Sequence, residues 1–340
     1  MSASGQAAAP PPVTVGAEAR ALSRQRPRLG DLTFRALVSG SGALIVAIFL
    51  AIGIFILDKA WPAISHYGIG SFLSGSRWAP SEAALNLEGK NPYGILQFVY
   101  GTVLTSAIAL LLAVPIAVGL ALYITEIAPS LIRRPLAYVI DILASVPSVV
   151  YGFWGIFALI PAVKPVANDL SDWLHSIPVV GPIFAGPFFG PSYFVAALVL
   201  AIMVLPIVTA ICREVFAVAP LAEKEAALAL GATRWEMIKL AILKRSRVGI
   251  FGAAILGLGR AFGETIAVTM VIGNSVLGIT TSIFGQGATM PSVIANEFTE
   301  ATEPFHLDSL FVVALCLLVV SLIVNTAGKL IISRVGTRIA

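Results

Sequence analysis

Six apolar runs dominate this chain of 340 residues, and they restrict it to a protein that crosses a membrane several times. A helix needs about 20 apolar residues to span the hydrocarbon core of a bilayer. Only 12% of the residues are charged, against about 25% in a soluble domain. The chain is therefore predicted to be an all-α polytopic membrane protein with six transmembrane helices. The predicted spans are 37–57, 100–124, 136–163, 193–211, 248–272 and 310–332.

The segment before the first span is rich in Ala, Pro, Ser and Arg and has almost no acidic residues. Such a composition cannot build an apolar core, so residues 1–35 are predicted to be a disordered tail and residues 36–340 a six-span domain. A cleaved signal peptide is disfavoured because the first apolar run has full spanning length, with Asp58 and Lys59 beyond it. An organelle transit peptide is the alternative that the Arg-rich, acid-poor tail leaves open.

The basic residues predict the orientation of the chain. Of the 22 Lys and Arg, 17 lie in the two terminal segments and the loops after spans two and four, and only four lie in the other loops. Cytoplasmic loops are the ones enriched in Lys and Arg, so both termini are predicted to be cytosolic. The outer loops are then 58–99, 164–192 and 274–306. This topology accounts for the net charge of +4 without a nucleic-acid partner.

Motifs for covalent chemistry are missing from the sequence. No Gly-x-x-x-x-Gly-Lys-Ser/Thr occurs, so no ATP site is predicted in this chain. The glycines at 257, 259 and 263 differ from a dinucleotide fingerprint in their spacing and lie inside a predicted span, where they favour close helix packing. The cysteines and histidines are Cys212, Cys316, His66, His175 and His306. They form no metal-binding or catalytic pattern, so catalytic residues, metal and cofactors are each predicted as none.

The segment 220–247 is the only long, charged stretch on the predicted cytosolic side, and its pattern is typical of helix, turn, helix. Pro220 suits the start of a helix, and Gly231 suits its end. Thr233 and Glu236 form a Thr-x-x-Glu capping box that begins the second helix. Small alanines around the turn would let a partner surface approach closely, and Trp235 and Met237 offer it apolar anchors. The alternative is an amphipathic helix on the inner leaflet, held by Lys239, Lys244, Arg245 and Arg247.

Two charged residues, Arg260 and Glu264, lie four positions apart inside the predicted fifth span. A charge at the bilayer centre costs about 2.5–3.5 kcal/mol on insertion scales, so such residues usually face protein or water and mark transport pathways. Arginine stays charged and binds phosphate or carboxylate oxygens two at a time. The alternative is an ion pair that only locks packing, and the two roles are compatible if Glu264 neutralises Arg260 until an anion displaces it.

Further polar residues lie beside proline breaks in the predicted spans. Pro147 interrupts the third span, where Ser148 and Tyr151 could direct hydroxyls at a substrate or could serve packing alone. Asp141 is predicted to reach the interface or to pair with Arg133 or Arg134.

Two stretches resemble known permeases. Glu225, Ala226 and Ala227 followed by Gly231 resemble the EAA loop of bacterial ABC importer permeases, although Lys244 stands where that family has proline. The run 256–274, with 147–152 and 292–298, resembles the PstC family, the permease subunits of phosphate-specific ABC importers, and the likeness covers most of residues 95–335.

This resemblance implies a type I ABC importer permease fold, inorganic phosphate as substrate and a multi-pass location in the bacterial inner membrane. The implied partners are a second permease (PstA-like), an ATPase dimer (PstB-like) that carries ATP and Mg, and an extracytoplasmic phosphate-binding protein (PstS-like). Residues predicted on the substrate pathway are Arg260, Glu264, Ser148, Tyr151 and Thr265. Residues predicted to couple to the ATPase are Glu225, Ala226, Ala227, Gly231 and Thr233. The alternatives left open are another oxyanion, such as sulfate or molybdate, and a secondary anion transporter or channel.

Overall fold

The computed structural model describes residues 29–81, 91–174, 177–178, 181–303 and 305–336. The chain has two units, 1–54 and 55–340. The described part of the first unit is the beginning of helix α2 (Leu29–Tyr67), where every side chain from residue 30 to 52 is exposed. Because α2 begins at Leu29, the predicted tail is wrong for residues 29–35, and its other residues, 1–28, lie outside the described residues.

The described residues are almost entirely helical, which confirms the predicted all-α class. Five helical segments are long and apolar enough to span a membrane, and a sixth span results when one bent pair of helices is counted. The spans are α2; α5 (Leu96–Leu122) with η1 (Tyr123–Ile127); α7 (Ser148–Trp154), η2 (Gly155–Leu159) and α8 (Ile160–Leu174); α9 (Tyr193–Ala217); α12 (Lys244–Gly263) with α13 (Ile266–Ile272); and α15 (His306–Gly336).

Helix α9 lies at the centre of the second unit, packed against α5, α12 and α6 (Ser130–Ser145). Four buried alanines recur every four residues along α5: Ala109, Ala113, Ala117 and Ala121. This spacing places small side chains on one face of α5, so that the backbones of α5 and α9 can approach closely. Gly257 of α12 has the same function, because a Cβ there would come 2.7 Å from Val204 and 2.9 Å from Val208. Close packing is thus confirmed for Gly257, whereas Gly263 has no atom within 4 Å of its would-be Cβ.

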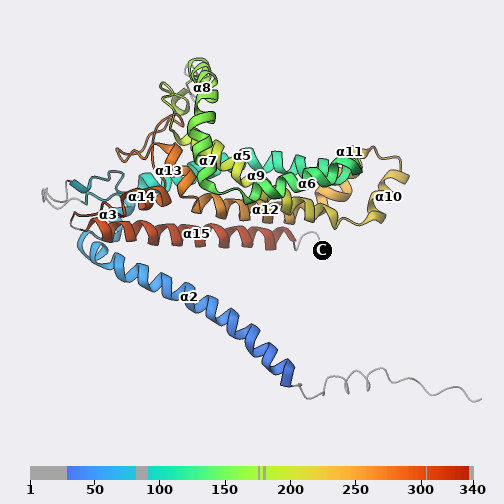
Figure 1. The fold of residues 1–340 in the computed structure, drawn as a ribbon, viewed down its shortest axis with the longest axis horizontal. Coiled ribbons are helices and arrows are strands. Elements are labelled where there is room, and N and C mark those ends of the chain that lie inside the picture. The colour runs from blue at the N-terminus through green and yellow to red at the C-terminus, as the bar shows by residue number, and fades with distance from the viewer. Residues whose placement is uncertain (1–28, 82–90, 175–176, 179–180, 304, 337–340) are drawn as a thin grey trace, which may run out of the picture. The chain divides into compact units, whose positions relative to one another are not determined.

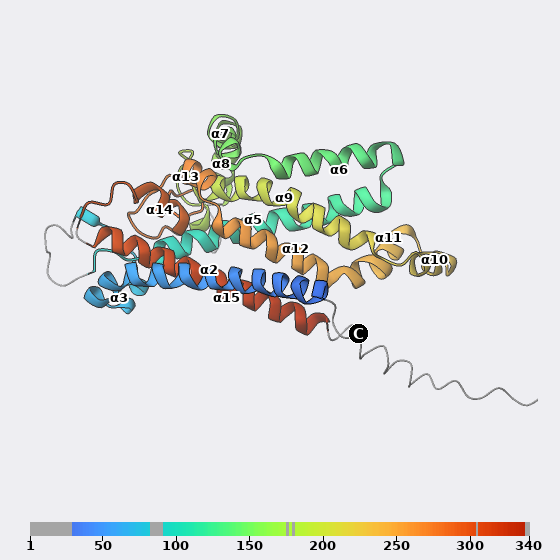
Figure 2. The same ribbon diagram turned by 60° about the horizontal axis from the view of Figure 1, so that its bottom comes forward.

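The connections gather at the two ends of the bundle. Helices α10 (Leu221–Ala229) and α11 (Arg234–Met237) lie at one end, and α3 (Ile69–Ser74), α13 and α14 (Met290–Glu297) lie at the other (Figures 1 and 2). The π-helical segment η4 (Ile238–Leu243) joins α11 to α12 without interruption. Lys244 therefore continues the helix, since it has the backbone N–H that the family's proline lacks.

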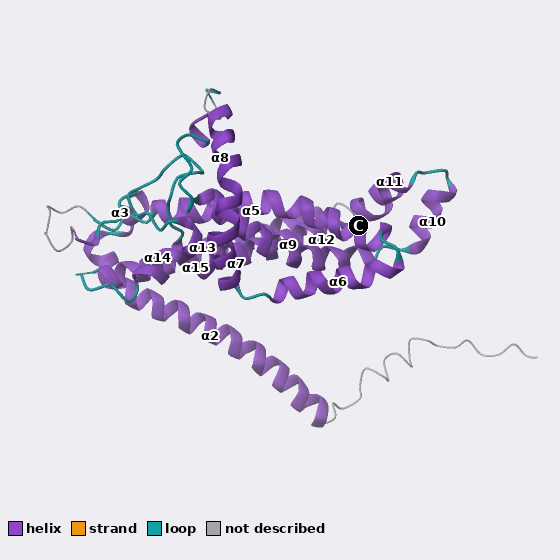
Figure 3. Cartoon of the chain, turned by 45° about the horizontal axis from the view of Figure 1, so that its top comes forward, coloured by secondary structure: helices purple, strands orange, loops and turns teal. Residues whose placement is uncertain are grey.

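The predicted third span, 136–163, is wrong because it joins two separate helices (Figure 3). Helix α6 ends at Ser145, Val146 is extended with ψ 131°, and α7 begins at Ser148. Pro147 causes this break, since a proline disfavours helical geometry in the residue before it. The span that replaces the prediction runs from Ser148 to Leu174, so the predicted outer loop 164–192 begins with helix.

The predicted fifth span is broken as well. Helix α12 ends at Gly263, α13 begins at Ile266, and their axes differ by 65°. Glu264 between them has extended backbone, with ψ 121°. The prediction that Arg260 and Glu264 both lie inside one continuous span is therefore wrong, because the helix ends between them.

The predicted outer loops contain ordered structure around a buried aromatic cluster. Glu297 on α14 accepts hydrogen bonds at one carboxylate oxygen from Trp78 Nε1 (2.6 Å) and pairs there with His306 Nε2 (2.8 Å). Tyr93 stacks on His306, and burial raises the pKa of its phenol, which therefore stays neutral at physiological pH. His306, for which no role was predicted, thus ties the start of α15 to α14 and to the loop around Trp78.

Candidate functional site

The predicted pathway residues lie around the two helix breaks. Arg260 is in the last turn of α12 and is exposed, whereas Glu264 is buried in the break that follows. Thr265 is half-buried, and its hydroxyl donates to the Gly263 carbonyl at 3.2 Å. Ser148 is the first residue of α7, and Tyr151 lies one turn further along the same helix.

Helices α7 and α13 are in close contact, which brings these two breaks together. Gly152 is the residue that permits the contact, because a Cβ there would lie 2.5 Å from Met270 Sδ and 3.3 Å from Ala267 Cα. The structure thus brings α7, which follows the first break, against α13, which follows the second, although Gly152 and Ala267 are more than 100 residues apart in the sequence.

Arg260 and Glu264 do not bind each other. In the described part of the chain no carboxylate lies within ion-pair distance of the Arg260 guanidinium. Glu264 instead accepts a hydrogen bond from the Ala267 N–H at 3.3 Å, at the first turn of α13. The ion pair that would only lock packing is therefore not formed, and Arg260 has no carboxylate partner among the described residues. Its position in the last turn of α12 is favourable because the C-terminal end of a helix attracts cations.

The Tyr151 hydroxyl is already engaged within the chain. It donates to the Leu143 carbonyl at 2.9 Å, across the break between α6 and α7. This hydroxyl therefore cannot donate its proton to a phosphate oxygen while the bond to Leu143 is made. A substrate role for Ser148 and Thr265 stays a prediction, and for Tyr151 the geometry favours positioning of α7.

The coupling segment, residues 220–247, has the predicted helix, turn, helix form. Gly231 has φ 86°, the left-handed conformation that favours glycine, and the Ala232 N–H donates to the Ala227 carbonyl at 3.1 Å. Thr233 and Glu236 form the predicted capping box, with the Thr233 N–H donating to Glu236 Oε2 at 2.8 Å. Pro220 caps α10 and precedes its first residue by one position.

The surface of this segment is largely unpacked within the chain. Glu225 and Ala226 are exposed, and the apolar side chains of Leu230 and Trp235 are 89% and 62% exposed. Met237 is only 5% exposed, so its predicted role as an anchor for a partner is wrong. It begins the buried face of the second helix, which continues with Ile238 and Ile242. Apolar side chains flanking small alanines are the composition expected of a surface that another protein covers.

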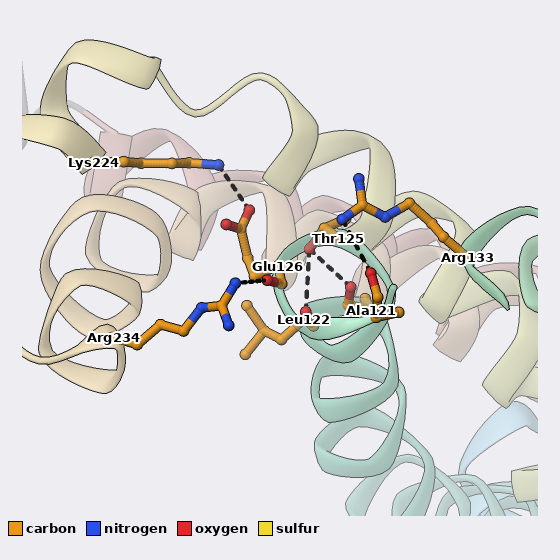
Figure 4. Close-up of polar contacts among 8 residues, drawn as sticks. Ala121, Leu122, Thr125, Glu126, Arg133, Lys224 and Arg234 are labelled. Atoms are coloured by element: carbon orange, nitrogen blue, oxygen red, sulfur yellow. Dashed lines mark hydrogen bonds and ion pairs between the residues drawn. The ribbon is translucent and has the colours of Figure 1, made fainter. Parts of the chain in front are cut away.

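Both helices of the coupling segment are attached to the end of α5 through Glu126 (Figure 4). Lys224 Nζ lies 2.7 Å from the Glu126 carboxylate, and both side chains are largely buried, with 17% and 11% exposed. Arg234 donates from Nη2 to the Glu126 backbone carbonyl at 2.9 Å. Sequence reasoning missed Glu126, because Lys224 is 98 positions away and no local pattern links them.

We expect reversal of the Glu126 charge to weaken coupling. Glu126→Lys or Lys224→Glu leaves two like charges in a largely buried position, which should lower substrate uptake by about tenfold or more. Glu126→Lys/Lys224→Glu restores opposite charges and should recover part of the loss. The measurement is uptake per assembled complex.

Glu223→Lys is the matched control, because Glu223 forms an exposed ion pair with Arg245 in the same segment, and such pairs contribute little. An equal loss in the control, or no recovery in the double variant, would contradict a specific role for Glu126.

Comparison with known proteins identifies the family. Residues 113–337 match the family described as binding-protein-dependent transport system inner membrane component. The phosphate transport system permease protein PstC of Mesorhizobium japonicum is 37% identical over 311 residues, which cover 91% of this chain and 92% of that protein. The protein of the same name from Haemophilus influenzae is 39% identical over 297 residues, covering 86% and 90%. The chain belongs to the PstC family.

Membership confirms the resemblance noted in the sequence and makes the chain a multi-pass transport component of an ABC transporter. Among solved structures, a bacterial ABC transporter that imports the acidic polysaccharide alginate matches 87% of this chain and 96% of its own, with 16% identity and a TM-score of 0.48. The inward-facing methionine transporter MetNI matches 71% of this chain and 97% of its own, with the same identity and TM-score.

Proposed function

We propose that this chain is the permease subunit of an ATP-driven importer that moves inorganic phosphate into the bacterial cytoplasm. The observation that carries the proposal is the Arg260 guanidinium at a broken span, without a carboxylate partner among the described residues, in a chain related to phosphate transport permeases over nine-tenths of its length. Phosphate is an anion at neutral pH, and an arginine at membrane depth attracts it through charge and through two parallel hydrogen bonds.

The proposed partners follow from what one chain of this kind lacks. A second, PstA-like permease would supply the other wall of the pathway, and a PstB-like ATPase dimer would bind ATP and Mg and hydrolyse the nucleotide. A PstS-like protein would deliver phosphate from outside. Closure of the ATPase dimer would pull on the coupling segment, and Glu126 would pass that movement to α5, so that the anion site faces each side in turn. Glu225, Ala226 and Ala227 would contact the ATPase, while Gly231 and Thr233 shape the turn.

The proposal is tested by reconstituting the chain with its partner permease and ATPases in proteoliposomes. We expect phosphate accumulation that requires ATP and the binding protein. If added sulfate or molybdate inhibited this accumulation more strongly than the same concentration of added phosphate, the chain would be assigned to another oxyanion. Uptake by this chain alone, without ATP, would support the secondary transporter instead.

The proposed orientation, with both termini in the cytosol, predicts which positions a membrane-impermeant thiol reagent can reach. In a background without Cys212 and Cys316, a cysteine at Gln286 should be labelled in intact cells, because this residue is exposed at the end opposite the coupling segment. A cysteine at Leu230 should be labelled only after the membrane is opened. Labelling of position 230 from outside would contradict the coupling role of the segment.

A further inference from the structure

A pocket of about 460 Å³ lies between α6, η1, α9 and the coupling segment, and the proposed pathway does not use it. Its walls carry four basic side chains and two carboxylates: Arg133, Arg134, Arg213, Lys224, Glu126 and Glu214. Figure 4 shows Glu126, Arg133 and Lys224 together at this place. The volume falls within the range of about 300–1,000 Å³ that small-molecule sites occupy.

Two of the four cations in the pocket are neutralised within the chain. Lys224 pairs with Glu126 at 2.7 Å. Arg213 lies 3.5 Å from Asp141 and 3.6 Å from Glu214, distances too long for good hydrogen bonds. The predicted pairing of Asp141 with Arg133 or Arg134 is therefore wrong, because α6 turns Asp141 toward α9.

The other two cations, Arg133 and Arg134, have no carboxylate within ion-pair distance among the described residues. Arg133 donates one hydrogen bond, from Nη2 to the Ala128 carbonyl at 3.3 Å. A further donor, Nη1 of Arg213, is buried and has no hydrogen-bond partner in the described part of the chain. The pocket thus holds more N–H donors than acceptors, which is the composition of an anion site.

We propose that this pocket binds a phosphate group at the cytosolic face of the membrane, either the headgroup of an anionic phospholipid or free inorganic phosphate. Arginine forks bind phosphate oxygens two at a time, and Arg133 and Arg134, which are adjacent in sequence and exposed, both line the pocket. Exposed apolar residues on the same helix, Leu131 and Tyr138, offer a surface to acyl chains. The proposal uses the proposed orientation of the chain but not the role assigned to Arg260.

Occupation of the pocket is linked to the coupling segment through Lys224. This lysine belongs to α10, and its ammonium group forms part of the pocket wall. A bound anion competes with Glu126 for Lys224, and so acts on the contact that attaches α10 to α5. Because coupling between two sites is reciprocal, docking of the ATPase also changes the affinity of the pocket for its anion.

The test uses the complete importer complex, purified in detergent, with two readouts. The first is native mass spectrometry of retained phosphatidylglycerol. The second is binding of radiolabelled inorganic phosphate to complexes that carry Arg260→Gln, so that the pathway does not contribute. The variants are Arg134→Gln and Arg133→Gln/Arg134→Gln. Lys329→Gln is the matched control, because Lys329 is an exposed cation near the cytosolic end of α15, outside the pocket, with no ion-pair partner among the described residues.

We expect either the retained phosphatidylglycerol or the bound phosphate to fall by about tenfold or more in the double variant Arg133→Gln/Arg134→Gln. The same quantity should stay unchanged in Lys329→Gln. Loss of lipid retention identifies the headgroup as the ligand, and loss of phosphate binding identifies the free anion. Equal values for the double variant and the control in both readouts overturn the proposal. Should the double variant fail to assemble, Arg134→Gln decides in the same way, because the exposed Arg134 side chain forms no hydrogen bond or ion pair with the described residues. The readouts measure binding and not uptake, so this proposal and the proposed function fail separately.

Discussion

Arg260→Gln is expected to abolish phosphate uptake by the assembled importer, and Arg260→Lys to reduce it by about tenfold or more. The glutamine removes the positive charge from the break between α12 and α13. The lysine keeps the charge but cannot reproduce the planar fork that binds two phosphate oxygens at once. Because Arg260 is exposed and has no carboxylate partner in the described structure, neither change should unfold the chain. The measurement is phosphate uptake per assembled complex in proteoliposomes.

Glu264→Gln separates the roles of the two charged residues. A glutamine side chain can still accept the hydrogen bond from the Ala267 N–H, so assembly should be normal. Glu264→Ala removes that acceptor at the start of α13 and should cost about 1 kcal/mol of stability. Since Arg260 and Glu264 do not pair, the double variant Arg260→Gln/Glu264→Gln should transport no better than Arg260→Gln. Wild-type uptake in the double variant would show that Arg260 does not bind the anion.

Ala226→Trp in the coupling segment is expected to abolish phosphate uptake while leaving the chain inserted in the membrane. The exposed Ala226 lies on α10, where a partner that packs against the small residues would meet a large ring. Trp235→Ala should weaken the same contact by removing an exposed aromatic side chain, which is the type of residue that often dominates interfaces. The measurements are uptake, ATP hydrolysis and copurification of the ATPase. Normal values of all three in Ala226→Trp would favour the amphipathic helix on the inner leaflet.

Gly231 needs a different substitution from Ala226. Its φ of 86° strains most residues other than glycine, by about 1–2 kcal/mol, so Gly231→Trp would test backbone strain as well as docking. Gly231→Asn is the better control, because asparagine tolerates the left-handed conformation. It should keep the turn, since no atom lies within 4 Å of a Cβ at this position.

The sequence predicted the parts of the fold that depend on local patterns. Five of the six predicted apolar runs lie inside observed spans, although the observed helices extend beyond them, and the Thr233 capping box specified the start of α11. The break at Pro147 was visible as a proline, yet the apolar run continued through it and concealed the end of α6. No residue near Glu264 predicted that its backbone would be extended. The contact of Glu126 with Lys224 was beyond prediction, because it depends on how two distant helices pack.

The contact between Gly152 and α13 has a mechanical consequence. With no side chain between them, α7 and α13 meet at Met270 and Ala267 and cannot slide past each other without separating. Each of these two helices, of which α7 is the first part of the span Ser148–Leu174, is also joined to the helix before it through an extended residue, Val146 or Glu264. Because α7 and α13 are in contact, a change of backbone angle at one break would move both helices together. Arg260, in the last turn of α12 before the second break, would therefore be covered or uncovered by one movement of both helices.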